Sequence, residues 1–491
     1  METIRVWKLN HATLKIDCDS GIAAELREFF SFYVPGYKFI PSYRNRLWDG
    51  KIRLFNAQNH ELPAGLFFHL MIFCKDRGYL AKVDSTDYGS PLDQNKITFE
   101  DLDKFIETLQ LPYTIRDYQK QGVIYGIKHK NGILLSPTGS GKSLIIYCLN
   151  RWYIQNYSKK ILIIVPTTSL VEQMYSDFEE YGFNVREYCH KIYSGKDKNT
   201  DKRLVISTWQ SIYKYPFQWF AQYGMVIGDE CHGFKSKSLM SIMNKSREAE
   251  YRFGTTGTLD GTQTHELVLQ GLFGKTYRVT STKKLQENDT LADLKINRIV
   301  LNYNDTERKE NTNKVYNDEI DYIIKHEKRN NFIKNLAIDQ KGNTLVLFKL
   351  VEKHGKPLYT IINNKASEKR KVFFVSGNTQ TSDREAIRGI VEKQKNAIIV
   401  ASLGTFSTGI NIRNLHNIIF ASPSKSQIRV LQSIGRGLRK SDNNEPTVLY
   451  DIIDDLQWHK KKNFALTHAD QRLLIYEKEK FLTKTFKVDF V

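Results

Sequence analysis

Short apolar runs alternate with amphipathic stretches over much of the chain. Between residues 113 and 282, five apolar runs have the length of buried strands: GILLS, KILIIVP, RLVIST, GMVIGDE and YRFGTT. Stretches with helical spacing, such as TSLVEQMYSDFEEY, lie between some of these runs. Because strands that alternate with helices form βαβ units, the pattern predicts a parallel, doubly wound sheet.

The same layout occurs a second time between residues 326 and 456. Five further apolar runs predict strands with helices between them: NTLVLFK, KVFFVSG, AIIVAS, NIIFAS and TVLYDII. The two regions share their layout and not their residues. The predicted fold class is therefore α/β, with two tandem parallel-sheet lobes.

The flanking regions have different patterns. Residues 1–95 mix short strand-like runs with one helical stretch, which predicts a small α+β domain, and the polar stretch DSTDYGSPLDQNK resembles a linker. The charge-rich segment after the first lobe holds one possible strand, INRIVLNY, and is predicted to join the lobes. The last residues predict a basic helical tail, with Lys460–Lys462 near its start. The predicted divisions are 1–95, 96–282, 283–325, 326–456 and 457–491.

Charge and cysteine content restrict the possible classes of protein. The 491 residues carry a net charge of +19 with a pI of about 9.4, which favours a polyanionic partner such as nucleic acid, with general solubility as the alternative. Five scattered cysteines without a C-x-x-C pair argue against a zinc ribbon or a disulfide framework. No apolar run approaches the roughly 18 residues of a membrane helix, and METIRVWKLN lacks the apolar core of a secretory signal. We expect a soluble, intracellular protein that does not enter a membrane.

The segment SPTGSGKS, residues 136–143, follows a predicted strand and precedes a predicted helix. That context is typical of a phosphate-binding loop, whose backbone N–H groups and helix N-terminus face phosphate oxygens. Lys142 can reach the β- and γ-phosphates, and the Ser143 hydroxyl can ligate Mg²⁺. The predicted nucleotide-binding residues of the loop are Thr138, Gly139, Ser140, Gly141, Lys142 and Ser143. Ser136 stands where the usual pattern has glycine, and a simple glycine turn is the alternative interpretation.

Two adjacent carboxylates follow the strand-like run in MVIGDECHGF. Beside a phosphate loop, Asp229 is predicted to hold the Mg²⁺ of a bound nucleotide, usually through water. Glu230 is predicted to orient and deprotonate the attacking water. His232 could be a metal ligand or a contact to a neighbouring motif, and the second is favoured because no other histidine or cysteine lies at ligand spacing.

The combination of TGSGKS and DECH resembles the superfamily 2 helicases and translocases. Further matches follow in that family's order: IRDYQ, VPTTSLVEQ, STWQS, TTGT, LGTFSTGINI and QSIGRGLRK. The matches extend from residue 115 to residue 440, and their joint occurrence is more specific than any one of them. The resemblance implies two RecA-like lobes with ATP bound between them.

The resemblance also assigns roles to individual residues. It implies that Arg116 and Gln119 contact adenine and that Gly409 contributes to nucleotide binding. It implies that Thr167, Thr208, Gln210 and Thr408 contact nucleic acid and that His232, Thr256 and Thr258 couple the ATP state to strand separation. Lys349 could add a phosphate contact, although a solvated lysine at a strand end fits equally. Asn411 departs from the pattern, because several helicase families carry aspartate there.

QSIGRGLRK would complete the ATP site from the second lobe. Gln432, Arg436 and Arg439 are predicted to act at the γ-phosphate, where one arginine stabilises transition-state charge. The two arginines are three residues apart and so share one helix face, which leaves open which of them is the finger. The alternative is a basic helix face that binds phosphate backbone.

Aromatic and basic residues interleave in YVPGYKFIPSYRNRLWDGKIRLF. Aromatic rings can stack on bases while cations hold phosphates. The segment therefore predicts a nucleic-acid contact through Arg44, Arg46, Trp48 and Lys51. A hairpin with an aromatic core face and a solvated basic face is the alternative, and WDG resembles a turn between strands.

The order and wording of the motifs, with WDG followed by KIRL near the N-terminus, resemble the UvsW-type helicases of bacteriophages almost end to end. This resemblance implies an ATP- and Mg²⁺-dependent helicase that remodels branched DNA through Holliday-junction branch migration, fork regression and R-loop unwinding. Branched or double-stranded DNA, or an RNA–DNA hybrid, would be its partner. A monomer in the cytoplasm of an infected bacterium is expected.

Other classes fit the sequence less well. A nucleotide kinase would not need the second lobe with QSIGRGLRK, and a catalytically silent scaffold would not need Lys142, Glu230 and Arg439. Within the helicase class, a double-stranded DNA translocase or an RNA helicase stays open.

Overall fold

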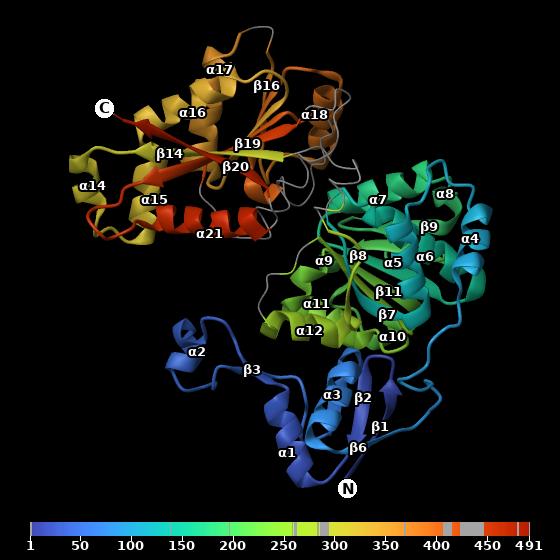
Figure 1. Ribbon diagram of the computed structural model, residues 1–491. Coiled ribbons are helices and arrows are strands. Elements are labelled where there is room, and N and C mark those ends of the chain that lie inside the picture. The colour runs from blue at the N-terminus through green and yellow to red at the C-terminus, as the bar shows by residue number, and fades with distance from the viewer. Residues whose placement is uncertain are drawn as a thin grey trace. The chain divides into compact units, whose positions relative to one another are not determined.

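The chain divides into two compact units, one of residues 1–136 and 141–280 and another of residues 137–140 and 281–491 (Figure 1). The computed structural model describes residues 2–137, 139–195, 197–257, 259, 263–281, 284, 294–367, 370–405, 415–422, 446–478 and 481–490. The first unit holds an N-terminal domain and one α/β lobe, and the second holds another α/β lobe.

The N-terminal domain is a small four-stranded sheet with two main helices. The strand order is β5 (Glu61–Pro63), β2 (Thr13–Asp17), β1 (Thr3–Asn10) and β6 (Leu80–Val83). Alternate strand residues such as Ile4, Val6, Leu14 and Ile16 share one core with α1 (Ser20–Phe29) and α3 (Phe67–Arg77). This period of two is the pattern of strands with one buried face. The predicted α+β domain is confirmed, with two main helices instead of one.

The N-terminal domain also has a separate two-stranded sheet. β3 (Ser31–Tyr33) pairs antiparallel with β4 (Lys51–Arg53). Between them lie the short helical turn Tyr37–Phe39 and α2 (Pro41–Arg44). Figure 1 shows α2 at the end of an arm that extends away from the four-stranded sheet.

The first lobe is a seven-stranded parallel sheet. Its order is β13 (Thr276–Arg278), β7 (Asn131–Leu135), β12 (Tyr251–Thr256), β11 (Tyr223–Asp229), β8 (Lys160–Val165), β10 (Leu204–Thr208) and β9 (Cys189–Ile192). All five predicted strands are present. Ile161 and Ile163 join a core with α5 (Asp117–His129), α6 (Lys142–Asn156) and α7 (Thr168–Glu180). Leu162 and Ile164 face the opposite core with α11 (Lys237–Lys245) and α12 (Gln263–Phe273), so the sheet is covered on both faces.

The second lobe repeats this architecture. Its parallel strands are ordered β16 (Val372–Val375), β17 (Ile398–Ser402), β15 (Thr344–Phe348), β18 (Asn417–Phe420), β19 (Thr447–Asp455), β14 (Leu294–Asn302) and β20 (Leu482–Asp489). α16 (Glu327–Asp339) and α17 (Lys356–Lys365) pack on one face, and α21 (Phe464–Lys478) packs against β19. Two tandem parallel-sheet lobes are thus confirmed.

Two predicted divisions need correction. The segment 283–325 was predicted to be a linker, but β14 within it pairs with β19 and β20, and α14 (Asp305–Asn311) and α15 (Tyr316–Lys325) follow. The tail 457–491 was predicted to be helical, and it holds α21 and also the edge strand β20. Both segments therefore belong to the second sheet and its cover.

Candidate ATP and nucleic-acid site

The phosphate loop connects β7 to the start of α6. Its backbone is tied to the neighbouring strand, because Ser136 N–H donates to the carbonyl of Thr256 at 2.9 Å. Gly139 and Gly141 have φ of 83° and 78°, a region that residues with a Cβ rarely adopt. The Ser140 hydroxyl donates to Pro137 O at 2.6 Å. The loop thus curls as a phosphate cradle requires.

The two carboxylates lie at the carboxyl end of β11 and face different partners. Thr255 Oγ1 donates to Asp229 Oδ1 at 2.6 Å, and Asp229 is buried. Glu230 Oε1 lies 3.6 Å from Lys142 Nζ. Burial raises the pKa of Asp229, the negative charge of Glu230 raises it further, and Lys142 opposes both. The phosphate loop and the acidic pair therefore form one cluster.

His232 connects this cluster to the next strand. Its Nδ1 lies 3.1 Å from Thr256 Oγ1 and 3.4 Å from Glu230 Oε2. The ring therefore lies between the carboxylate and the TTGT segment, which is the contact that the sequence favoured over metal ligation. In the described part of the chain, no three His, Cys, Asp or Glu side chains are arranged to hold a metal ion by themselves.

Gln119 belongs to the same site. Its Oε1 accepts from Arg116 N–H at 2.9 Å, and its amide packs so closely on Gly141 that a Cβ there would collide with it. Arg116 is exposed, and its Nη1 donates to the Tyr118 hydroxyl at 3.1 Å. The IRDYQ segment thus lies against the phosphate loop.

Oxygen donors suited to Mg²⁺ are present. The Ser143 hydroxyl and the Asp229 carboxylate are hard oxygen ligands, which Mg²⁺ prefers, and bound phosphates usually supply others. A hydrogen bond joins Ser143 to the Tyr181 side chain, and burial raises the pKa of Tyr181. Sequence reasoning singled out neither Tyr181 nor Thr255, because both contacts join distant segments.

The predicted nucleic-acid residues of the first lobe lie close together. Thr167 begins α7, and its Oγ1 accepts from Leu170 N–H at 3.4 Å. Thr208 ends β10 and directly precedes the short helix α9 (Trp209–Ile212), with its Oγ1 3.0 Å from Ser211 Oγ. Gln210 Nε2 donates to Pro166 O at 3.4 Å and so links the two loops.

A groove of about 910 Å³ lies beside these loops. Its lining includes Trp209, Gln210, Tyr213, Lys214, Tyr215 and Lys198. The Lys198 ammonium lies over the ring of Tyr215 at 5.6 Å. Aromatic rings interleaved with lysines are the composition of surfaces that bind nucleic-acid strands.

The other predicted residues lie elsewhere. Arg44, Arg46, Trp48 and Lys51 are on the N-terminal arm, where Trp48 Nε1 donates to Lys51 O at 2.9 Å and Lys51 pairs with Glu28 at 2.9 Å. In the second lobe, Lys349 Nζ donates to the Tyr316 hydroxyl at 3.4 Å. Thr138, Thr258, Thr408, Gly409, Gln432, Arg436 and Arg439 lie outside the described residues.

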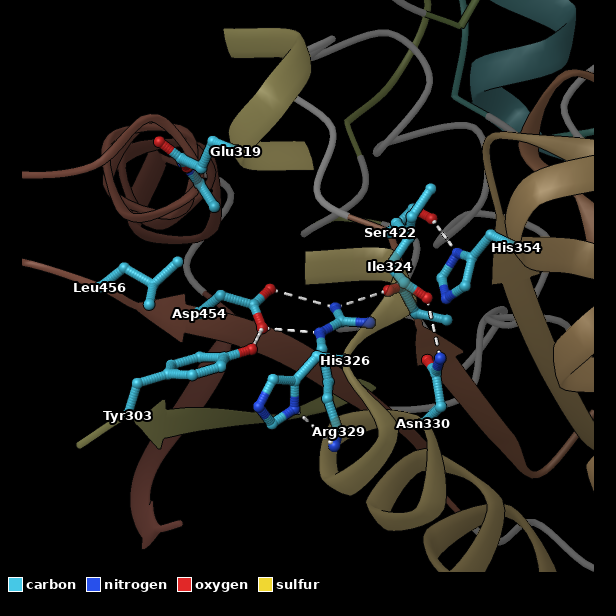
Figure 2. Close-up of polar contacts among 12 residues, drawn as sticks. Tyr303, Glu319, Ile324, His326, Arg329, Asn330, His354, Ser422, Asp454 and Leu456 are labelled. Atoms are coloured by element: carbon cyan, nitrogen blue, oxygen red, sulfur yellow. Dashed lines mark hydrogen bonds and ion pairs between the residues drawn. The ribbon is translucent and has the colours of Figure 1, made fainter. Parts of the chain in front are cut away.

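A buried polar network in the second lobe was not predicted. Figure 2 shows Arg329, Asp454 and Tyr303 pointing toward one another. Arg329 Nε lies 2.6 Å from Asp454 Oδ1, the Tyr303 hydroxyl donates to the same oxygen at 2.9 Å, and Arg329 Nη2 donates to Ala421 O at 2.7 Å. His354 Nδ1 lies 2.8 Å from Ser422 Oγ. Carboxylates in the apolar run TVLYDIIDD were the available signal, since buried charges need partners.

This network fixes the residues that precede segment 423–445. Ala421 and Ser422 follow β18 and end this described range, and Gln432, Arg436 and Arg439 come later in the chain. The network therefore holds Ala421 and Ser422 in place just after β18.

Known proteins resemble this chain over most of its length. Three family models match: the N-terminal domain of DNA helicase UvsW at residues 3–84, the res subunit of type III restriction enzymes at 110–261, and the helicase conserved C-terminal domain at 327–441. The ATP-dependent DNA helicase uvsW of Enterobacteria phage T4 is 37% identical over 97% of this chain and 98% of its own length. The DNA 3'-5' translocase XPB2 of Sulfurisphaera tokodaii is 23% identical over 69% of this chain and 81% of its own.

Among solved structures, the crystal structure of T4 UvsW matches with a TM-score of 0.52 and 35% identity, covering 100% of both chains. A DNA-bound Type ISP restriction-modification enzyme, LlaBIII, matches with a TM-score of 0.55 at 15% identity, covering 78% of this chain and 32% of its own. That likeness shows the fold alone. None of the helices in the described ranges has the length and apolar character needed to cross a membrane.

Proposed function

Because the chain belongs to the UvsW family of ATP-dependent DNA helicases, we propose that it remodels branched DNA by Holliday-junction branch migration, fork regression and R-loop unwinding. The observation that carries this proposal is the continuous set of contacts from Lys142 through Glu230 and His232 to Thr256. These contacts join the phosphate loop to the segment that would sense the ATP state. The protein would act as a monomer in the cytoplasm of an infected bacterium.

The first lobe would bind and cleave ATP. The phosphate-loop amides and Lys142 bind the phosphates, and Gln119 and Arg116 contact the adenine edge. Mg²⁺, held by Ser143 and Asp229, would neutralise charge on the β- and γ-phosphates. When a triphosphate draws Lys142 away, Glu230 is released to accept a proton from the attacking water.

The second lobe would complete the site. Gln432, Arg436 and Arg439 face the γ-phosphate in this proposal, and an arginine finger contributes about 10³–10⁵ in rate. Gly409 contacts the nucleotide from the same lobe. Because the site has halves on two lobes, ATP binding closes the lobes and hydrolysis opens them.

Nucleic acid would run along both lobes. Thr167, Thr208 and Gln210 bind the sugar-phosphate backbone from the first lobe, and Lys349 and Thr408 bind it from the second. Such contacts position a strand without reading its sequence. His232, Thr256 and Thr258 couple the nucleotide state to these loops, so that each ATP cycle moves the loops along the nucleic-acid strand.

Phosphate release measured with different nucleic acids tests the proposal. Single strands, linear duplexes, Holliday junctions and R-loops are compared at one salt concentration, because phosphate contacts make affinity steeply salt-dependent. We expect branched substrates to stimulate turnover most, and Lys142→Ala to abolish turnover with every substrate. Equal stimulation by linear duplex and junction would support a duplex translocase instead, and turnover indifferent to nucleic acid would overturn the proposal.

A further inference from the structure

The N-terminal arm ends in a knob, defined here as residues 34–50, whose tip is apolar. Phe39 is 76% exposed and Leu47 is 81% exposed, more than any other large apolar side chain in the part of the chain that the structure describes. They flank α2 on either side. Exposed apolar side chains that gather in one patch often mark an interaction site.

Contacts between aromatic rings support the knob. The rings of Tyr33 and Tyr37 stack at 4.7 Å, and Tyr43 meets Tyr37 edge-on at 4.7 Å. Gly50 lies so close to the Tyr37 ring that a Cβ there would collide with it. A backbone hydrogen bond joins the two sides of α2, with Leu47 N–H donating to Ser42 O at 2.8 Å. The exposed side chains are therefore carried on a supported structure.

Cations surround the apolar tip. Lys38, Arg44 and Arg46 all lie within the knob, and none of them forms an ion pair with another described residue. By contrast, Lys51 and Arg53, which follow the knob, pair with Glu28 and with Asp49 at the end of the knob. Positive charge is thus left unneutralised beside Phe39 and Leu47 and is neutralised farther back.

The domain that bears the knob is fastened to the first lobe. Leu267 of α12 is part of the N-terminal domain core, and His69 Nε2 lies 2.6 Å from Gln270 Oε1. Gly65 lies directly on the α12 backbone, where a Cβ would be 2.6 Å from Gly274 N and would collide with Gln270 O. Because α12 follows the TTGT segment in the chain, the knob is carried by the lobe that binds ATP.

We propose that the knob is a wedge for the branch point of DNA, an inference that rests on the proposed function. Phe39 and Leu47 pack on the face of the base pair exposed at the branch, and Lys38, Arg44 and Arg46 hold phosphates of the diverging strands. An apolar surface ringed by phosphates exists where strands part, whereas the middle of a duplex hides its base faces. Apolar wedges that unstack base steps use the same chemistry.

The double variant Phe39→Ala/Leu47→Ala tests the wedge in the full-length protein. With saturating Holliday junction, the ratio of junction unwinding to duplex-stimulated ATP turnover should fall about fivefold or more, because stacking of an aromatic ring on a base is worth at least about that factor. A 2-aminopurine base at the branch point should brighten when the natural protein binds and stay quenched with the variant. Both side chains point into solvent, so the urea unfolding midpoint should not change.

Two further variants distinguish the role of the apolar side chains from that of the basic ones. Arg44→Ala/Arg46→Ala should weaken junction binding and reduce the slope of log affinity against log salt by about 2, while the 2-aminopurine signal persists at saturation. Leu474→Ala, which changes a leucine on α21 that is 66% exposed, should match the natural protein in every assay.

The outcomes distinguish the two proposals. A natural protein without DNA-stimulated turnover would overturn the proposed function and the wedge with it. Active natural protein, combined with a Phe39/Leu47 variant that keeps both the unwinding ratio and the 2-aminopurine signal, would overturn the wedge alone. The same result is expected if another protein covers the tip instead of DNA.

Discussion

Glu230 stands in the left-handed region of backbone conformation, with φ 50° and ψ 48°, immediately after β11. A residue with a Cβ pays roughly 1–2 kcal/mol for this conformation. The resulting turn sends the two neighbouring carboxylates apart, Asp229 toward Thr255 and Glu230 toward Lys142 and His232. Local strain of this kind persists where the geometry serves a site.

Glu230→Gln should separate ATP binding from ATP cleavage. The amide keeps the shape of the side chain but cannot accept a proton, so kcat for phosphate release should fall by about 10²–10⁴. The Kd for ATP should change little, because the phosphate loop is untouched. Single-turnover phosphate release and nucleotide-binding titrations measure the two quantities. Glu352→Gln, an exposed surface change, is the control, and turnover within a few-fold of the natural protein in Glu230→Gln would remove Glu230 from the reaction.

His354 should make the second lobe sensitive to acid. Burial, with the charge of Arg329 second, lowers the pKa of His354 to about 3. Since the unfolded ring titrates near 6.5, the unfolded chain binds more protons between about pH 6.5 and pH 3. The free energy of unfolding therefore falls as pH is lowered through this range, by about 2 kcal/mol at pH 5 from this group alone.

Urea unfolding of His354→Asn at pH 7 and pH 5 measures this contribution. The variant should lose less stability than the natural protein between the two pH values, because asparagine does not titrate. Asparagine can still hydrogen-bond to Ser422. An identical pH dependence in both proteins would show that His354 is protonated as readily when folded as when unfolded.

At the scale of elements, apolar runs revealed the buried strands and little else. All ten runs became strands of the two parallel sheets, where most of their residues are buried. β20 reads LTKTFKVD and lies at the sheet edge with most of its side chains exposed, so no apolar run marked it. β14 was marked as a possible strand by INRIVLNY, but Lys295, Asn297 and Arg298 lie among its apolar residues, and the segment around it was predicted to be a linker.

For the site too, the sequence predicted some contacts and missed others. Contiguous segments such as SPTGSGKS were predictable because neighbours in sequence remain neighbours in the folded loop. The contacts of Thr255 with Asp229 and of Tyr181 with Ser143 join separate elements, so no spacing in the sequence announced them. Arg329 and Asp454 are 125 residues apart and meet only because α16 packs beside β19.

Gly65 should be needed to hold the N-terminal domain on α12. In Gly65→Ala the added methyl would meet the backbone oxygen of Gln270, and backbone cannot rotate away as a side chain can. We expect a loss of about 1–3 kcal/mol in stability, as for other overpacked contacts. The linker at residues 84–96 should also be cut faster in limited proteolysis. Gly389→Ala meets open space and is the matched control; equal behaviour of the two variants would contradict a tight contact.

At the scale of the whole molecule, each unit has its own core, but the proposed catalytic groups are shared between them. Residues 1–280 contain complete cores for the N-terminal domain and the first lobe. They also contain Lys142, Glu230 and the residues of the first lobe that are proposed to contact nucleic acid. The proposed finger residues, Gln432, Arg436 and Arg439, belong to the rest of the chain.

A fragment of residues 1–280 should therefore fold and bind nucleotide without useful turnover. Circular dichroism and a cooperative unfolding transition would show that it folds, and a nucleotide titration would show binding. Its phosphate release should stay near the level of full-length Lys142→Ala with or without DNA, because loss of the finger alone removes about 10³–10⁵ in rate. DNA-stimulated turnover by the fragment at the rate of the intact chain would place the whole reaction in one lobe, and closure of the two lobes would then have no catalytic role.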